Sequence, residues 1–228
     1  MERAEIVVVV AGGPGANGAV PARVGALPPG TPVVAADAGV DRALALGLRV
    51  TVAIGDFDSV TSTGLRAAAS GGARIDRHPA DKDATDLELA LAAALELEPE
   101  RILVLGSDEG RLDHLLSSLL LLGAERFASV ELDALLGAAT VHAVRRERRL
   151  EGSPGELVSL LALHGPAVGV VTAGLRYPLS GETLEPGSSR GVSNVFVAPE
   201  ARIALERGVL LAVRPGREAG HEAERRSA

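Results

Sequence analysis

Cysteine and tryptophan are absent from this 228-residue sequence, and other aromatic side chains are scarce, with one tyrosine and three phenylalanines. Without cysteine there are no disulfides and no cysteine-ligated zinc, which is typical of a cytoplasmic protein. The shortage of aromatic rings leaves a core of Leu, Val, Ala and Ile, and few flat faces on which a ligand could stack. We therefore expect a cytoplasmic protein with an aliphatic core.

Positive charge and long apolar runs are also in short supply. The formal net charge is −7 at pH 7, whereas proteins that bind nucleic acid present basic faces. The run "IVVVV" near the N-terminus is too short for a signal peptide, and no apolar run reaches transmembrane length. The sequence thus predicts neither a nucleic acid nor a membrane as a partner.

Short apolar runs alternate with segments of helical periodicity over residues 1–136. The strands are expected at 5–10, 32–36, 51–54, 73–77 and 101–106. The helices are expected at 38–46, 60–71, 83–97 and 112–122. Because continuous apolar strands separated by helices indicate a mainly parallel sheet with both faces covered, we expect an α/β N-terminal domain.

The pattern changes after about residue 137. Short β-like runs are separated there by Gly, Pro and Ser, with no convincing helix. This pattern is typical of an antiparallel, all-β arrangement, so residues 137–214 are predicted to form a smaller sandwich-like domain. The polar tail at 215–228 is predicted to be disordered.

A glycine motif follows the first expected strand. Residues 13–18, "GPGANG", fit the G-x-G-x-x-G pattern of dinucleotide-binding proteins, and Asp37 lies downstream where such proteins place a ribose-binding acid. The third glycine should open a helix that holds the pyrophosphate. Pro21 and the pair Pro28 and Pro29 leave too little room for that helix, so a simple glycine-rich loop is favoured, which could still lie near a phosphate.

Acidic residues gather where the expected strands end. They are Asp37, the pair Asp56 and Asp58, and the group Asp81, Asp83 and Asp86. In an open parallel sheet the ligands bind at this edge, and in an extended turn the side chains of Asp56 and Asp58 would point the same way. Carboxylates held together call for a cation, and oxygen ligands without cysteine favour Mg²⁺.

Helix capping offers a competing explanation for part of this pattern. Asp83 would cap the helix expected at 83–97, with Asp86 three positions later reaching back, and Asp37 could simply begin a turn. Capping does not require a second acid in "GDFDS", nor acids at three successive strand ends. The joint pattern therefore favours a metal site.

A candidate phosphate site follows the strand at 101–106. Arg111, Asp113 and His114 open a Leu-rich helix, and a helix start beside an arginine attracts phosphate. Lys82 would be a further phosphate contact. For His114 a structural hydrogen-bonding role is favoured over a catalytic one, because nothing pairs it with a nucleophile.

Several motifs together resemble the thiamine pyrophosphokinase family. "AADAGVDRALALG", "IGDFDSV", "DKDATDLELAL" and "GRLDH" occur in that family's order and spacing, and "GLRYPL" and "SSRGVSN" resemble motifs of its second domain. The resemblance implies an α/β domain, a β-sandwich domain, and a homodimer whose thiamine sites lie between the α/β domain of one subunit and the β domain of the other. It also implies transfer of pyrophosphate from ATP to the hydroxyethyl oxygen of thiamine, which gives thiamine diphosphate and AMP.

The same motif match implies roles for individual residues. Mg²⁺ would be held by Asp56, Asp58 and Asp86, with Asp37 at the reacting end. ATP would be bound by Lys82, Asp83, Thr85, Arg111, Asp113 and His114. Thiamine would be bound by Ser193, Asn194 and Tyr177, although Tyr177 could equally be a packing residue beside Pro178.

Three questions stay open at this point. Either Asp37 or Asp86 could accept the proton of the thiamine hydroxyl. Asp108 and Glu109 stand where the family usually has small or uncharged residues, and acids there would weaken triphosphate binding unless they face solvent or a second cation. The alternatives to the thiamine enzyme are a pyrophosphokinase for another alcohol, such as a hydroxymethylpterin, and a non-catalytic nucleotide- or thiamine-binding protein.

Overall fold

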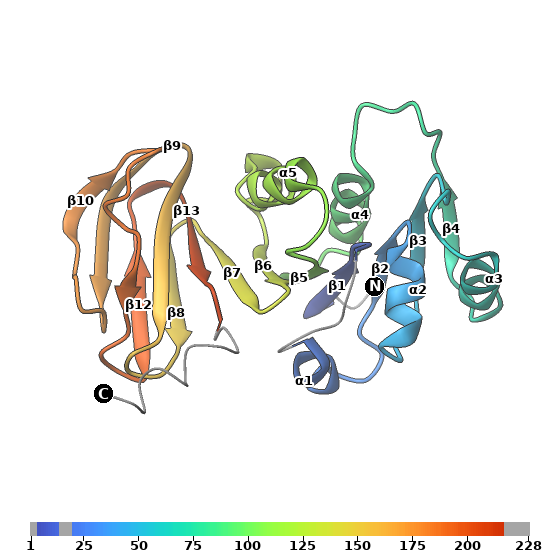
Figure 1. The fold of residues 1–228 in the computed structure, drawn as a ribbon, viewed down its shortest axis with the longest axis horizontal. Helices are drawn as coiled ribbons and strands as arrows, with labels where there is room; N and C mark the ends of the chain where they lie inside the picture. Colours follow the sequence, from blue (N-terminus) through green and yellow to red (C-terminus); the bar gives the residue numbers. More distant parts are fainter. Residues whose placement is uncertain (1–3, 14–19, 217–228) are drawn as a thin grey trace. The chain divides into compact units, whose positions relative to one another are not determined.

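The computed structural model describes residues 4–13 and 20–216 (Figure 1). The chain divides into two compact units, Met1–Gly137 and Ala138–Ala228. Nearly all of the tail that was predicted to be disordered lies outside the described residues, as does most of the glycine-rich loop. None of the helices among the described residues is both long and apolar enough to cross a membrane.

The N-terminal unit contains a parallel sheet of six strands. They are β1 (Ile6–Val10), β2 (Val33–Ala36), β3 (Val52–Gly55), β4 (Arg74–Arg77), β5 (Arg101–Gly106) and β6 (Glu131–Leu136). The order is β4-β3-β2-β1-β5-β6, and every neighbouring pair is parallel. The mainly parallel sheet expected from the apolar runs is confirmed, with β6 as an additional strand that was not expected.

Helices connect these strands and cover the sheet. They are α1 (Val20–Gly25), α2 (Gly39–Ala45), α3 (Ser62–Ser70), α4 (Asp86–Leu95) and α5 (Leu112–Leu122), with a short 3₁₀ helix at Glu125–Phe127. Right-handed crossovers in this strand order place α1, α2 and α3 on one face and α4 and α5 on the other. Figure 1 shows α2 and α4 beside β1 and β2, and both helices contact these two strands.

Helix α1 corrects one expectation from the sequence. The segment after the glycine-rich loop was judged too short for the helix that a dinucleotide site requires, and no helix was expected there, yet six residues at Val20–Gly25 are helical. Pro21 stands in the first turn, where a missing backbone N–H costs nothing. Of the glycine motif at residues 13–18, only Gly13 is among the described residues.

The C-terminal unit is built of antiparallel strands. They are β7 (Ala139–Val144), β8 (Glu147–Glu151), β9 (Leu157–Ala173), β10 (Ser180–Leu184), β11 (Asn194–Val195), β12 (Glu200–Ala204) and β13 (Arg207–Arg214). Within this unit, β13 pairs with β7 and β9, β12 pairs with β8 and β9, and β10 and β11 also pair with β9. The structure shows no helix in residues 138–216, which confirms the expected all-β region.

Strand β9 is longer than the sequence suggests. Short runs separated by Gly, Pro and Ser were expected in this region, but β9 continues through Gly165 and Pro166 and is 17 residues long. His164 and Gly165 both have positive φ, at 57° and 140°, and the pairing with β13 shifts register here. A local bulge of this kind bends a strand without ending it. Leu160 of β9 belongs to an apolar core of the C-terminal unit that also includes Phe196 and Ile203.

Candidate active site

Three of the predicted acids meet at the carboxyl edge of the parallel sheet. Asp37 directly follows β2, and Asp56 and Asp58 follow β3. Each of the three offers a carboxylate oxygen, and these oxygens all lie within 4.8 Å of one another. The expectation that acids at neighbouring strand ends converge is met for these three residues.

The turn after β3 brings the two acids of "GDFDS" together in an unexpected way. The sequence suggested an extended turn, but Phe57 has φ of 63°, in the left-handed region. Phe57 is only 9% exposed and belongs to the apolar core of the N-terminal unit. Burial of this side chain offsets the cost of the left-handed backbone. The turn leaves Asp56 partly buried and Asp58 exposed.

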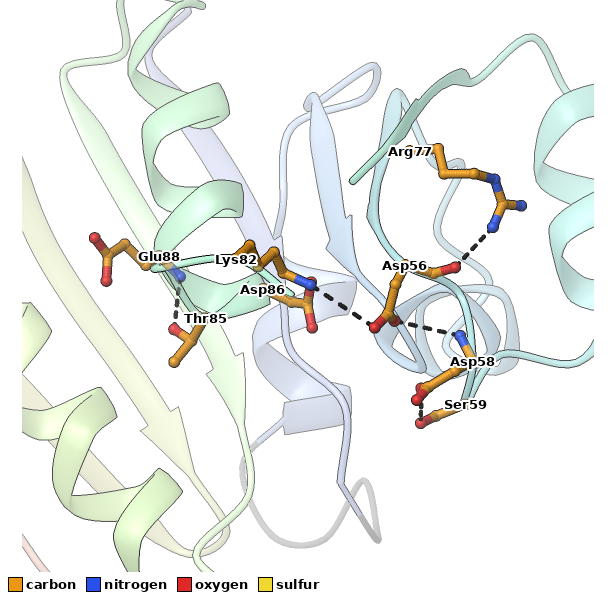
Figure 2. A network of polar contacts seen from close by, with 8 residues as sticks. All are labelled: Asp56, Asp58, Ser59, Arg77, Lys82, Thr85, Asp86 and Glu88. Atoms are coloured by element: carbon orange, nitrogen blue, oxygen red, sulfur yellow. Dashed lines mark hydrogen bonds and ion pairs between the residues drawn. The ribbon is translucent and has the colours of Figure 1, made fainter. Parts of the chain in front are cut away.

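Hydrogen bonds hold this turn in place (Figure 2). The backbone N–H of Asp58 donates to Asp56 Oδ1 at 3.3 Å, and the Ser59 hydroxyl donates to Asp58 Oδ1 at 2.6 Å. Arg77, at the end of β4, donates to the carbonyl oxygen of Asp56 at 2.7 Å and places its guanidinium 4.9 Å from the centre of the Phe57 ring. Groups of the turn itself thus bind both carboxylates, and Arg77 of the neighbouring strand holds the backbone of Asp56.

Asp86 approaches the same site from the start of α4. A Cβ atom at Gly55 would lie 3.2 Å from Asp86 Oδ1 and 3.3 Å from the Cβ atom of Asp37, so Gly55 leaves the space that both acids use. Burial raises the pKa of Asp37, and the negative charge of Asp86 adds to this, while hydrogen bonds from Ala38 and Ser59 act in the opposite direction. Asp86 is thus close enough to Asp37 for its charge to disfavour ionisation of Asp37.

Two buried oxygens in this site lack hydrogen bonds. Within the described part of the chain, neither Asp37 Oδ1 nor Asp86 Oδ1 has a hydrogen-bond partner, and both are shielded from solvent. Buried carboxylate oxygens are costly unless a donor or a cation satisfies them. This donor set, made only of carboxylate oxygens, fits a hard divalent cation.

Lys82 supplies positive charge to the acids. Its Nζ lies 3.1 Å from Asp86 Oδ1 and 3.8 Å from Asp56 Oδ2 (Figure 2). The lysine side chain is 13% exposed, so the pair is more shielded than a typical surface ion pair. Lys82 was predicted as a phosphate contact, and here it binds the acids.

The start of α4 shows that capping does not account for the acids. Thr85, and not Asp83, is the N-cap residue, because its hydroxyl oxygen accepts a hydrogen bond from the backbone N–H of Glu88 at 3.2 Å. Asp86 is the first helical residue, and Asp83 is exposed outside the helix. The capping explanation given for Asp83 and Asp86 is therefore wrong.

The candidate phosphate site follows β5. In the sheet β1 lies between β5 and β2, so this site is not on a strand next to those that carry Asp37, Asp56 and Asp58. Arg111 stands at the N-cap position of α5 and donates to both carboxylate oxygens of Asp113, at 3.1 Å and 2.6 Å. This guanidinium lowers the pKa of Asp113 to about 2. Arg111, Asp113 and His114 are all exposed, as are Asp108 and Glu109 in the turn before them.

The residues predicted for thiamine lie together in the C-terminal unit. Tyr177 exposes 54% of its surface, whereas Asn194 is buried and exposes only 4%. The backbone of Tyr177 forms two hydrogen bonds with the side chain of Asn194. Ser193 is exposed, has φ of 59°, and donates its backbone N–H to the Ser159 hydroxyl at 3.1 Å.

Comparison with known proteins identifies both halves of the chain. The family description "Thiamin pyrophosphokinase, catalytic domain" matches residues 30–132, which include the acids, Lys82 and Arg111. The description "Thiamin pyrophosphokinase, vitamin B1 binding domain" matches residues 141–210, which include Tyr177 and Asn194. The chain belongs to the thiamine pyrophosphokinase family.

Individual relatives agree with this assignment. The thiamine pyrophosphokinase of Bacillus subtilis is 27% identical over 217 residues, which cover 90% of this chain and 96% of that protein. A crystal structure of thiamine pyrophosphokinase from Bacillus subtilis has a TM-score of 0.81 at 26% identity and covers 93% of this chain and 100% of that one. The enzyme from Candida albicans, at 14% identity and a TM-score of 0.75, covers 92% of this chain and 88% of its own, and shares the fold.

In this family member the structure also shows a supporting residue, Arg42, that was not predicted from the sequence. Arg42 of α2 is 91% buried and donates to the carbonyl oxygens of Ala11 and Leu105 at 3.3 Å each, and to that of Gly106 at 2.9 Å. Burial lowers the pKa of Arg42. It binds the ends of β1 and β5 from the helix that follows Asp37. A charged residue on the apolar face of a predicted helix is the signal that could have revealed it.

Proposed function

We propose that this protein transfers pyrophosphate from ATP to the hydroxyethyl oxygen of thiamine, giving thiamine diphosphate and AMP. The observation that carries the proposal is the group of Asp37, Asp56 and Asp58 at the strand ends, within a segment that matches the catalytic domain of the family. In open parallel sheets this edge is where ligands bind. The matching thiamine-binding segment argues for thiamine, and against a pterin alcohol, as the acceptor.

We propose Mg²⁺ as the cation that these acids hold. Asp56 and Asp58 are its ligands in this proposal, with Asp86 or Asp37 completing the set. Asp37 Oδ1 is buried without a hydrogen bond in the described structure, and the buried Asp86 Oδ1 has only the Lys82 ammonium beside it, at 3.1 Å. When bound, Mg²⁺ would neutralise charge that develops on the phosphoryl oxygens. The hard, all-oxygen donor set supports this choice.

The remaining roles belong to the chain's own side chains. Lys82 and Arg111 are the cationic groups available to bind phosphate oxygens. Asp37 is favoured over Asp86 as the group that accepts the proton of the thiamine hydroxyl. Burial raises the pKa of Asp37, which makes it the better base, whereas Asp86 is paired with Lys82.

Thiamine binding is proposed for the exposed Tyr177 and Ser193, whose region matches the thiamine-binding description. The ring of Tyr177 offers an apolar face to the pyrimidine or the cationic thiazolium. The homodimer, the use of ATP and the cytoplasmic location stay predictions from the sequence.

The test is the release of AMP from ATP by purified protein with Mg²⁺, measured with and without thiamine. AMP that depends on thiamine, with no ADP, is the expected result and identifies both the pyrophosphoryl transfer and its acceptor. AMP formed only with a hydroxymethylpterin would overturn the acceptor. Tight ATP binding without turnover of any alcohol would favour a binding protein.

A further inference from the structure

Lys82 is the only lysine in the chain. The other 22 of the 23 lysines and arginines are arginines. Among the described residues, arginines form ion pairs with carboxylates at Arg74, Arg101, Arg111, Arg126, Arg149, Arg190, Arg202 and Arg214. The single lysine instead pairs with Asp56 and Asp86 of the candidate site. Lysine differs from arginine in carrying a compact point charge on a flexible stem, whereas arginine binds carboxylates as a rigid planar fork.

The lysine ammonium is the charge partner of Asp86. Its Nζ lies 3.1 Å from Asp86 Oδ1. That oxygen is shielded from solvent and makes no hydrogen bond within the described part of the chain. The ammonium therefore provides the compensation that a buried carboxylate needs.

Asp56 belongs to two arrangements at once. Its Oδ2 lies 3.8 Å from the Lys82 ammonium, and Asp56 also contributes an oxygen to the group that it forms with Asp37 and Asp58. A cation held by that group would share Asp56 with the ammonium. Two positive charges at one carboxylate repel each other strongly in a partly buried site, so the ammonium and the cation compete.

We propose that Lys82 is the internal counter-ion of the metal-free site, and that binding of a divalent cation displaces its ammonium from Asp56 and Asp86. The displaced ammonium then becomes available to the phosphates of ATP. This inference rests on the proposed metal site and adds an order of events, in which the cation binds first and the lysine moves second. A flexible single-point donor can make this exchange, whereas a bidentate arginine would stay on its carboxylate.

Because the chain has one lysine, its side chain can be observed alone. Protein produced with [¹³Cε]lysine gives a single lysine signal in a ¹H–¹³C spectrum, that of Lys82, provided that no lysine is added by a tag. Mg²⁺ is titrated into the nucleotide-free protein, and its binding is followed by calorimetry in parallel. We expect the signal to move with the same saturation curve as the calorimetric binding, and not to move in Asp58→Asn.

A signal that stays fixed while calorimetry shows Mg²⁺ bound, and that moves only when ATP is added, would overturn the exchange. So would the absence of Mg²⁺ binding to the nucleotide-free protein. Both outcomes are separate from failure of the proposed function, because thiamine-dependent AMP release is measured on the same preparation. The spectrum uses the wild-type chain, so it does not depend on whether a variant folds.

Two substitutions at Lys82 provide an independent measurement. Lys82→Gln removes the competing charge, so Mg²⁺ should bind the nucleotide-free protein roughly tenfold more tightly or better. Lys82→Arg keeps the charge and should bind Mg²⁺ no more tightly than wild type does. Equal affinities in all three proteins would show that the lysine does not compete, and would overturn the proposal. A melting curve for each variant establishes that it is folded.

Discussion

The side-chain amide of Asn194 binds both backbone polar groups of Tyr177. The N–H of Tyr177 donates to Asn194 Oδ1 at 3.0 Å, and Asn194 Nδ2 donates to the carbonyl oxygen of Tyr177 at 2.7 Å. The same Oδ1 accepts the backbone N–H of Val195 at 2.9 Å. These bonds occupy both acceptor sites of the amide and one of its two N–H groups. The geometry indicates that Asn194 fixes Tyr177, whose ring is exposed.

The first prediction follows from that arrangement. Asn194→Ala should raise the KM for thiamine while leaving the KM for ATP near the wild-type value, because the loop that carries Tyr177 loses its anchor. Tyr177→Ala should have a similar effect. If Asn194 acts through Tyr177, the double variant should be no worse than Tyr177→Ala, since residues that act together are not additive.

Steady-state kinetics on the four proteins of this cycle provide the measurement. If the double variant raises the KM for thiamine by the product of the two single effects, Asn194 contributes to thiamine binding independently of Tyr177. Tyr177→Phe is the matched control for the ring, because it removes only the hydroxyl. We expect it to stay close to wild type.

The second prediction concerns the charge of Asp58. Asp58→Asn keeps an oxygen that can accept the hydrogen bond from Ser59, but it removes the negative charge needed to hold Mg²⁺. Turnover should fall by roughly a hundredfold or more, as expected when a metal ligand is lost. Asp81→Asn, at an exposed acid with no proposed role, is the control. Near wild-type turnover of Asp58→Asn would refute the metal assignment.

The third prediction concerns the space that Gly55 leaves for the acids. In Gly55→Ala the new methyl group would press on Asp86 Oδ1 at 3.2 Å and on Asp37, and the backbone φ of 146° disfavours any side chain. We expect a marked loss of turnover in addition to a loss of stability. Gly30→Ala is a matched control, because Gly30 also has positive φ, at 80°, but has no neighbour within 4 Å.

Gly30→Ala should cost about 1 kcal/mol from backbone strain and leave turnover unchanged. The comparison of thermal unfolding and kcat for the two variants separates strain from crowding of the site. Equal losses of kcat in both would mean that Gly55 has no particular role at the acids.

Much of the fold could be predicted because buried parallel strands and amphipathic helices leave clear patterns. The strand at 101–106 and the helix at 112–122 agree with β5 and α5 at both ends. The acids at the strand ends were also found, since the carboxyl ends of parallel strands all lie at the same edge of the sheet. These features depend on residues that are close in sequence.

The features that were missed depend on contacts between distant residues. The left-handed conformation of Phe57 is maintained by burial of its ring, which local propensity does not report. Strand β9 continues through Pro166 because its neighbours tolerate a bulge there. The binding of Tyr177 by Asn194 joins residues 17 positions apart, and no pattern of sequence indicates it.

The last prediction uses the pKa of Asp37, which burial raises. A raised pKa means that the folded state disfavours the charged carboxylate, so this residue lowers stability as the pH rises through and above its ordinary value of 3.8. Asp37→Asn removes that charge. The metal-free variant should therefore melt a few degrees above wild type at pH 7, although it should have little activity.

The pH dependence of the melting difference tests this reasoning. In buffers with a chelator, the advantage of Asp37→Asn should shrink as the pH falls toward 3.8, because wild-type Asp37 then carries its proton and resembles the amide. Saturating Mg²⁺ at pH 7 should also reduce the difference in melting temperature between Asp37→Asn and wild type. A cation that binds the acids of folded wild-type protein stabilises the folded state and not the unfolded one. If Asp37→Asn instead melts below wild type at pH 7 without metal, the carboxylate makes a net favourable contribution, and burial is not the dominant influence on its charge.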